Sequence, residues 1–153
     1  MSFFPLFKKK EFFSVDQKER IVAAIKSMEQ QTSGEIRVYV ESNNPMVNPV
    51  DRAGQIFFKL KMDKTDERNG VLLYIATKHK ELALFGDEGI YKATGATYWD
   101  DAVKDMISHF KADDICEGMV QCIRRVGETL KEKFPYNKTE DKNELPDEIV
   151  FGN

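Results

Sequence analysis

The spacing of hydrophobic positions in this 153-residue chain changes several times, and each change marks a predicted element. Residues 14–31 repeat apolar side chains at helical spacing behind a capping box made by Ser14 and Gln17, which predicts a helix. Residues 35–41 then alternate between apolar and polar, with period two. This alternation predicts the first strand.

A second helix is predicted from Asn48, a good N-cap residue, followed by Pro49 at the first helical position. Residues 71–76 form the most apolar stretch of the chain, which is typical of a central strand covered on both faces. Residues 77–80 fit a hairpin connection to a third strand at 81–85. The two later strands should therefore run antiparallel.

Helical patterns occupy the second half of the chain. We expect a short helical turn over residues 90–96, a third helix opening at Thr97 or Tyr98, and a fourth capped by Asp113 and stopped at Phe134. The resulting order is α-β-α-β-β-α-α. It predicts an α/β fold in which a mixed β-sheet packs between α-helices as a three-layer sandwich.

Length and termini indicate one domain over residues 1–136, with an acidic tail over 137–153. Residues 1–13 are aromatic and basic, and they either pack along the domain or touch a membrane surface or a partner. The end of the tail, Ile149–Phe151, could dock back on the domain. The longest apolar run is far below the roughly 20 residues of a membrane span, so we expect a cytoplasmic protein. We also expect a monomer.

The charges are unevenly distributed along the chain. There are 23 basic and 26 acidic residues, and the net charge of −3 argues against a generic nucleic-acid-binding protein. Eight acidic and three basic residues between Asp87 and Glu117 give that segment a charge of −5. Residues 137–148 carry −3, which leaves +5 for the remainder.

Topology suggests that part of this acidic charge converges. A helical crossover makes the first two strands parallel, so Glu35 and Asn69, which begin them, should share a sheet edge with Asp87 and Glu88, which follow the third strand. Further acidic residues precede this edge or could approach it from helix starts: Asp63, Asp66, Glu67, Asp100, Asp101, Asp113 and Asp114.

Clustered carboxylates repel one another unless a proton or a cation relieves the repulsion. A site made only of oxygen ligands suits Ca²⁺ or Mg²⁺ rather than zinc. Each acidic pair also has an ordinary explanation as a helix cap or as solvated surface. The chain contains no EF-hand loop, Walker loop, nucleophile elbow or paired-cysteine motif.

Three segments resemble the strand motifs of the TPM domain family: SGEIRVYV at 33–40, RNGVLLYIA at 68–76 and LFGDEGI at 84–90. The resemblance extends through the later helices and covers roughly residues 14–134. The closing residues 143–147 resemble the tail of a small bacterial branch of that family. The resemblance implies an α/β sandwich, in agreement with the predicted order of elements.

The resemblance also implies a function, because the family is associated with binding of divalent cations, mainly Ca²⁺, at an acidic cleft. We therefore expect a cation-dependent binding or regulatory module that could present a surface to a protein partner. The alternative is a metal-dependent acid phosphatase acting on phosphomonoesters. Many members carry a signal peptide and a membrane span, and this sequence shows neither. Carried over by position, the metal site falls on Glu35, Asp87, Glu88, Asp100, Asp101, Asp113 and Asp114.

Overall fold

The computed structural model describes residues 12–136 and 148–152 of the chain. In this part of the chain the predicted order holds with two additions: the expected helical turn is a separate helix, and a short strand follows the last helix. The elements are α1 (Val15–Glu29), β1 (Glu35–Glu41), α2 (Pro49–Lys59), β2 (Gly70–Ala76), β3 (Glu81–Gly86), α3 (Glu88–Thr94), α4 (Ala96–Lys111), α5 (Ile115–Lys133) and β4 (Val150–Phe151).

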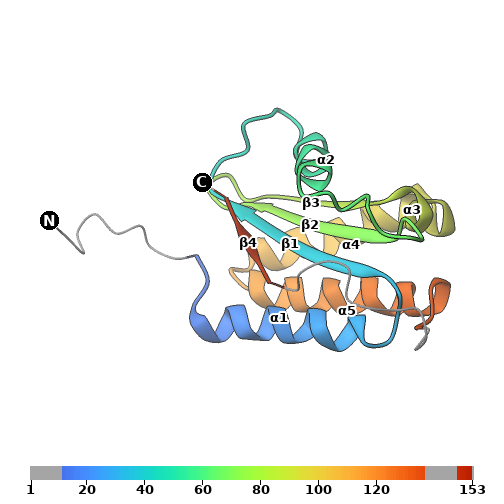
Figure 1. Ribbon diagram of the computed structural model, residues 1–153. Helices are drawn as coiled ribbons and strands as arrows, with labels where there is room; N and C mark the ends of the chain where they lie inside the picture. The colour runs from blue at the N-terminus through green and yellow to red at the C-terminus, as the bar shows by residue number, and fades with distance from the viewer. Residues whose placement is uncertain (1–11, 137–147, 153) are drawn as a thin grey trace, which may run out of the picture.

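The strands form one mixed sheet in the order β3-β2-β1-β4 (Figure 1). β1 and β2 are parallel, with Val38 opposite Leu73, and β3 is antiparallel to β2. Every residue of β2 is buried, which confirms the prediction of a central strand. β1 and β2 therefore begin where β3 ends, at what we call the α3 end of the sheet. The opposite side, with the β2–β3 turn, is the hairpin end.

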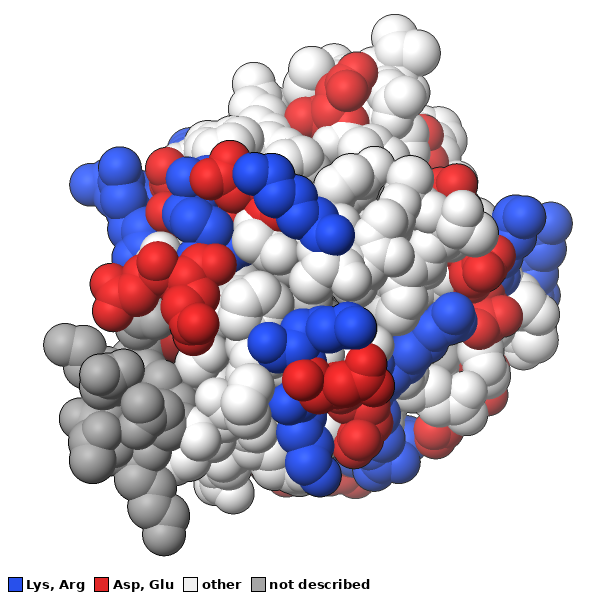
Figure 2. Space-filling view, turned by 90° about the vertical axis from the view of Figure 1, so that its right-hand side faces the viewer, with Lys and Arg blue, Asp and Glu red and all other residues white. Residues whose placement is uncertain are grey.

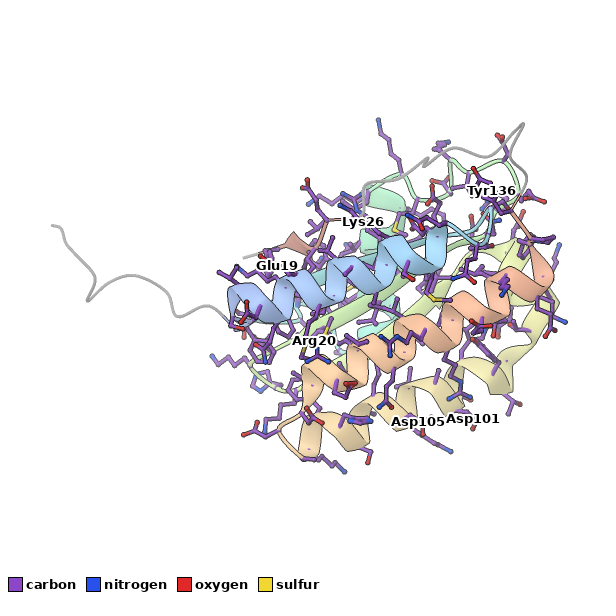
Figure 3. All side chains as sticks on the ribbon, turned by 90° about the horizontal axis from the view of Figure 1, so that it is seen from below. Glu19, Arg20, Lys26, Asp101, Asp105 and Tyr136 are labelled. Carbon is purple, nitrogen blue, oxygen red and sulfur yellow. The ribbon has the colours of Figure 1, made fainter. Side chains whose placement is uncertain are left out.

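Helices cover both faces of this sheet, as predicted. α2 lies on one face, where Phe57 and Tyr74 belong to the smaller of two apolar cores (Figure 1). α1, α5 and α4 lie side by side on the other face (Figure 3). Their apolar sides form the larger core, which includes Ile25 and Ile123. The fold is a mixed sheet between helical layers.

The first two helices begin where the sequence predicts. Ser14 and Gln17 form the reciprocal hydrogen bonds of a capping box at the start of α1. Asn48 caps α2 by accepting a hydrogen bond from the Val50 N–H at 2.8 Å. These starts are predictable because the capping side chains act within three residues of themselves.

The later helix starts differ from the prediction. α4 begins at Ala96, directly after Gly95, and has no side-chain cap. α5 begins at Ile115 and follows Asp114, so the expectation that Asp113 caps this helix is wrong. Asp113 instead has a φ of 61° and its N–H bonds to the Phe110 carbonyl, which makes it part of the end of α4.

Both ends of the described chain pack on the domain. Phe13 is 1% exposed, which confirms packing for that part of the aromatic segment, whereas residues 1–11 lie outside the described residues. β4 pairs with β1 in parallel, confirming that the end of the tail docks. The rest of the predicted tail, 137–147, lies outside the described residues. No helix in the described part is long and apolar enough to cross a membrane.

The two cysteines are buried free thiols in α5, as expected for core positions. Burial raises the pKa of Cys122 to about 12 and also raises the pKa of Cys116. Because the thiolate is the reactive form, we expect neither thiol to react with Ellman's reagent while the protein is folded. Both should react after unfolding in guanidinium. A fast native reaction of either thiol would contradict this burial.

Candidate functional site

Asp87 organises the α3 end of the sheet. Its N–H bonds to the Gly70 carbonyl at 2.9 Å, which continues the β2–β3 ladder by one residue. Its carboxylate accepts a hydrogen bond from the Glu88 N–H at 2.8 Å and thereby caps α3. The residue is only 3% exposed, so an ionised carboxylate here needs a compensating positive charge.

Arg68 supplies that charge. Its Nε and Nη2 donate to the two carboxylate oxygens of Asp87 at 2.7 and 2.8 Å, a bidentate arrangement. Its Nη1 donates to Glu88 at 3.2 Å. The hydrogen bonds with Asp87 raise the pKa of Arg68. The guanidinium therefore binds the carboxylates of two predicted metal ligands, Asp87 and Glu88, at the same time.

A second polar group lies beside this ion pair. Asn69 Nδ2 donates to Ser33 Oγ at 3.2 Å, and Ser33 Oγ donates in turn to Glu67 at 2.6 Å. Asn69 is 1% exposed, and its Oδ1 has no hydrogen-bond partner among the described residues. A buried amide oxygen in that state attracts a water molecule or a cation.

Glu35 adjoins this group at the start of β1. Its N–H bonds to the Asn69 carbonyl at 3.4 Å, so the backbone joins the two residues across the β1–β2 boundary. Glu35 is 2% exposed. The α3 end thus combines two buried acidic residues, Glu35 and Asp87, with a buried amide oxygen and the carboxylate of Glu67.

The structure brings together four of the seven residues predicted as metal ligands. Glu35, Asp87 and Glu88 lie at the α3 end. Asp100 borders a pocket that is also lined by Arg68, Asp87 and Glu88. Asp101 is exposed and lies beside Asp105 on α4, which is at one edge of its helical layer (Figure 3).

Asp113 and Asp114 lie elsewhere, so the expected approach of the α4–α5 turn to the acidic edge is wrong. This turn is at the hairpin end, on the other side of the molecule from α3 (Figure 1). Lys80 of the β2–β3 turn lies 5.9 Å from the ring centroid of Phe110, in the last turn of α4. Asp114 contacts His109 at 3.7 Å.

The α3 end is also less acidic than the charge count suggests. Figure 2 looks onto this end and shows basic side chains interleaved with acidic ones, rather than one continuous acidic patch. In the described part of the chain, no three His, Cys, Asp or Glu residues are grouped closely enough to hold a metal ion. The seven residues therefore do not form one metal cage.

A buried charged cluster at the hairpin end had no signal in the sequence pattern. Arg52 of α2 donates to both carboxylate oxygens of Glu41, each at 2.8 Å, and the Tyr74 hydroxyl donates to the same carboxylate. Burial disfavours the charged form of Glu41, but the hydrogen bonds from Arg52 and Tyr74 outweigh it and lower the pKa of Glu41. The cluster fastens α2 to the sheet.

The described residues define the class of the protein: an α/β sandwich with a charged edge at the α3 end of its sheet. The family model for the TPM domain matches residues 6–129. The chain therefore belongs to the TPM domain family, as the strand motifs predicted. No curated protein matches the sequence.

Solved structures of other proteins match the fold of this chain. The BA42 protein from the psychrophilic bacterium Bizionia argentinensis is 37% identical, with a TM-score of 0.86 over 95% of this chain and 99% of that one. An N-terminal domain from Corynebacterium glutamicum matches at 18% identity and TM-score 0.59, over 78% of this chain and 74% of that one. One from P. gingivalis matches at 17% and 0.59, over 80% and 78%. The last two show similarity of fold alone.

Proposed function

We propose that this TPM domain is a binding module that takes Ca²⁺ or Mg²⁺ at the α3 end. The proposed ligands are oxygen atoms around Asn69, rather than the seven acidic residues as a set. The observation that carries the proposal is the buried Asn69 Oδ1, which has no partner among the described residues. Amide and carboxylate oxygens are the ligands that these hard cations prefer.

The neighbours of Asn69 support this assignment chemically. Glu35 is bonded to it through the backbone, and Glu67 is linked to it through Ser33. Two carboxylates and one amide oxygen from the start of β1 and the loop before β2 suit a divalent cation better than a transition metal. A cation there would tie that loop to β1 and so stabilise the position of Arg68.

The phosphatase alternative is less well supported. A phosphomonoester is held by cationic donors, and an arginine that grips two anionic oxygens is the usual choice. At the α3 end, Arg68 already uses Nε, Nη1 and Nη2 on Asp87 and Glu88. Phosphate binding would have to break that ion pair. We therefore favour the binding module over the enzyme.

We expect CaCl₂ or MgCl₂ at millimolar concentration to raise the melting temperature, because a ligand that binds only the folded state stabilises it. In ¹⁵N–¹H spectra the largest shifts should fall on residues 33–35 and 67–70. Paired Glu35→Gln and Glu67→Gln changes should abolish both responses, since they remove two proposed anionic ligands.

The control is Asp113→Asn with Asp114→Asn, which removes the same charge at the hairpin end and should leave both responses intact. Loss of the response in this control, with retention in the Glu35→Gln, Glu67→Gln protein, would move the site to the α4–α5 turn. No response in the unaltered protein would refute cation binding. Metal-dependent hydrolysis of p-nitrophenyl phosphate that Arg68→Met abolishes would favour the phosphatase.

A further inference from the structure

An apolar pocket lies next to the α3 end, along the edge strand β3. Its volume is about 530 Å³. α2 forms one wall with Val50 and Phe58, and α3 and α4 form the other with Tyr91 and Trp99. Because β3 is the outermost strand on its side of the sheet, the pocket opens where the two helical layers diverge.

The walls carry large apolar side chains that remain exposed. Phe58 is 53% exposed, Val50 48% and Tyr91 45%. A contiguous group of this kind is a usual mark of an interaction site, whereas single exposed apolar residues are not. The rings are also supported by neighbours, since Tyr91 stacks on Trp99 at 6.4 Å and 7°. Phe58 contacts Phe85 edge-on at 6.0 Å.

The floor of the pocket contains backbone of β3. The Asp87 N–H bonds to the Gly70 carbonyl, and along an antiparallel ladder hydrogen-bonded pairs alternate with pairs that are not hydrogen-bonded. Phe85, two residues before Asp87, therefore belongs to a hydrogen-bonded pair with β2. The N–H and C=O groups of Leu84 and Gly86 consequently point away from β2, and both residues line the pocket. This floor offers main-chain donors and acceptors to an extended peptide.

The charged rim indicates what kind of peptide fits. It has two basic and three acidic side chains, a formal charge of −1. Arg68 is occupied by Asp87 and Glu88, and Asp100 makes no ion pair with the described residues. The exposed ring of Tyr91, which lines the same pocket, adds a surface on which a cation is favoured. The net charge of −1, which already counts Lys92, therefore favours a positive charge on the ligand.

We propose that this pocket binds an extended segment of a partner protein that presents an apolar side chain flanked by lysine or arginine. The apolar side chain enters between Phe58 and Tyr91, and the basic side chain lies against Asp100. The backbone of the segment pairs with Leu84 and Gly86. This site is distinct from the cation ligands proposed around Asn69.

The test uses the full chain and a synthetic probe, acetyl-Lys-Val-Lys-Phe-Lys-Val-amide, with a partner probe in which glutamate replaces each lysine. Trp99 is the only tryptophan and lines the pocket, so its fluorescence reports binding. We expect a saturable change with the lysine probe and an affinity about tenfold weaker for the glutamate probe. Titration in EDTA and again with CaCl₂ separates this test from the cation proposal.

Variants are followed by anisotropy of a fluorescein-labelled lysine probe. Tyr91→Ala and Asp100→Asn should each weaken binding about tenfold, as expected for central contacts. Tyr136→Ala is the matched control, because Tyr136, labelled in Figure 3, is 43% exposed and is not among the residues that line the pocket. Circular dichroism checks that each variant is folded, and Asp100→Asn changes only an exposed side chain.

Three results would overturn the proposal. Equal affinity for both probes would show nonspecific apolar binding, and absence of binding in both EDTA and CaCl₂ would show that the pocket accepts no such segment. Self-association in analytical ultracentrifugation that Tyr91→Ala abolishes would assign the pocket to a second copy of the chain. Loss of affinity confined to Tyr91→Ala and Asp100→Asn supports the proposal.

Discussion

Replacing Arg52 with methionine is expected to lower the free energy of unfolding by about 3 kcal/mol at neutral pH, the usual cost of leaving a buried charge unpaired. The Glu41 side chain is 4% exposed and accepts two hydrogen bonds from Arg52, each at 2.8 Å. Methionine keeps most of the stem's apolar packing, so the loss reports mainly the electrostatics. Urea unfolding followed by circular dichroism measures it.

The pH dependence of this difference identifies its origin. In the unaltered protein the pKa of Glu41 is lowered below its ordinary 4.5, so the pair stabilises the fold above that pH. The contribution is lost as the pH falls through the lowered value. Without Arg52, burial would be opposed less, so the pKa of Glu41 would rise from its lowered value. The difference between the two proteins should therefore be largest near neutrality and shrink in acid.

An exposed ion pair provides the control. Arg20 and Glu117 meet at 2.9 Å, but the Arg20 side chain is 51% exposed, so Arg20→Met should cost less than about 1 kcal/mol. Adding Glu41→Gln to Arg52→Met should recover part of the lost stability, because it removes the stranded charge. A difference that is independent of pH would instead assign the loss to packing.

The sequence predicted the parts of the fold that depend on local pattern. The strand at residues 35–41 and the start of α2 at Pro49 follow from alternation and from a capping asparagine, which act over a few neighbouring residues. The start of α5 was placed one residue too early, because either of two adjacent aspartates fits the pattern of a helix start and neither side chain caps α5 in the structure. Only the backbone conformation of Asp113, with φ of 61°, assigns it to the end of α4.

The candidate site was predictable only in part. Strand directions correctly gathered Glu35, Asp87 and Glu88 at one end of the sheet. α4 has 16 residues, each adding about 1.5 Å, so the α4–α5 turn lies at the opposite end of the sheet. The predicted length of this helix already implied that position. The pairing of Arg68 with Asp87 joins residues 19 apart and depends on a loop conformation that no charge count reveals.

The second large loss of stability is expected from Gly89→Ala, because Gly89 contacts the loop that carries Arg68. A Cβ atom at Gly89 would lie 2.3 Å from the Glu67 carbonyl oxygen and 2.6 Å from that of Arg68. Both obstacles are backbone, and the Gly89 N–H bonds to the Arg68 carbonyl at 2.8 Å. The start of α3 therefore rests directly on the loop before β2. We expect a loss of about 3 kcal/mol in urea unfolding, at the upper end for overpacking.

Gly95→Ala separates this clash from backbone strain. Gly95 ends the same helix with φ of 81° and ψ of 166°, a region essentially confined to glycine, and a Cβ atom there would have no neighbour within 4 Å, so alanine meets strain alone, about 2 kcal/mol. Amide shifts of residues 67–70 and 87–88 should change in Gly89→Ala and stay fixed in Gly95→Ala. Because Arg68 joins that loop to α3, Gly89→Ala should also weaken the response to CaCl₂. Unchanged loop shifts in Gly89→Ala would show that α3 can move away without disturbing Arg68.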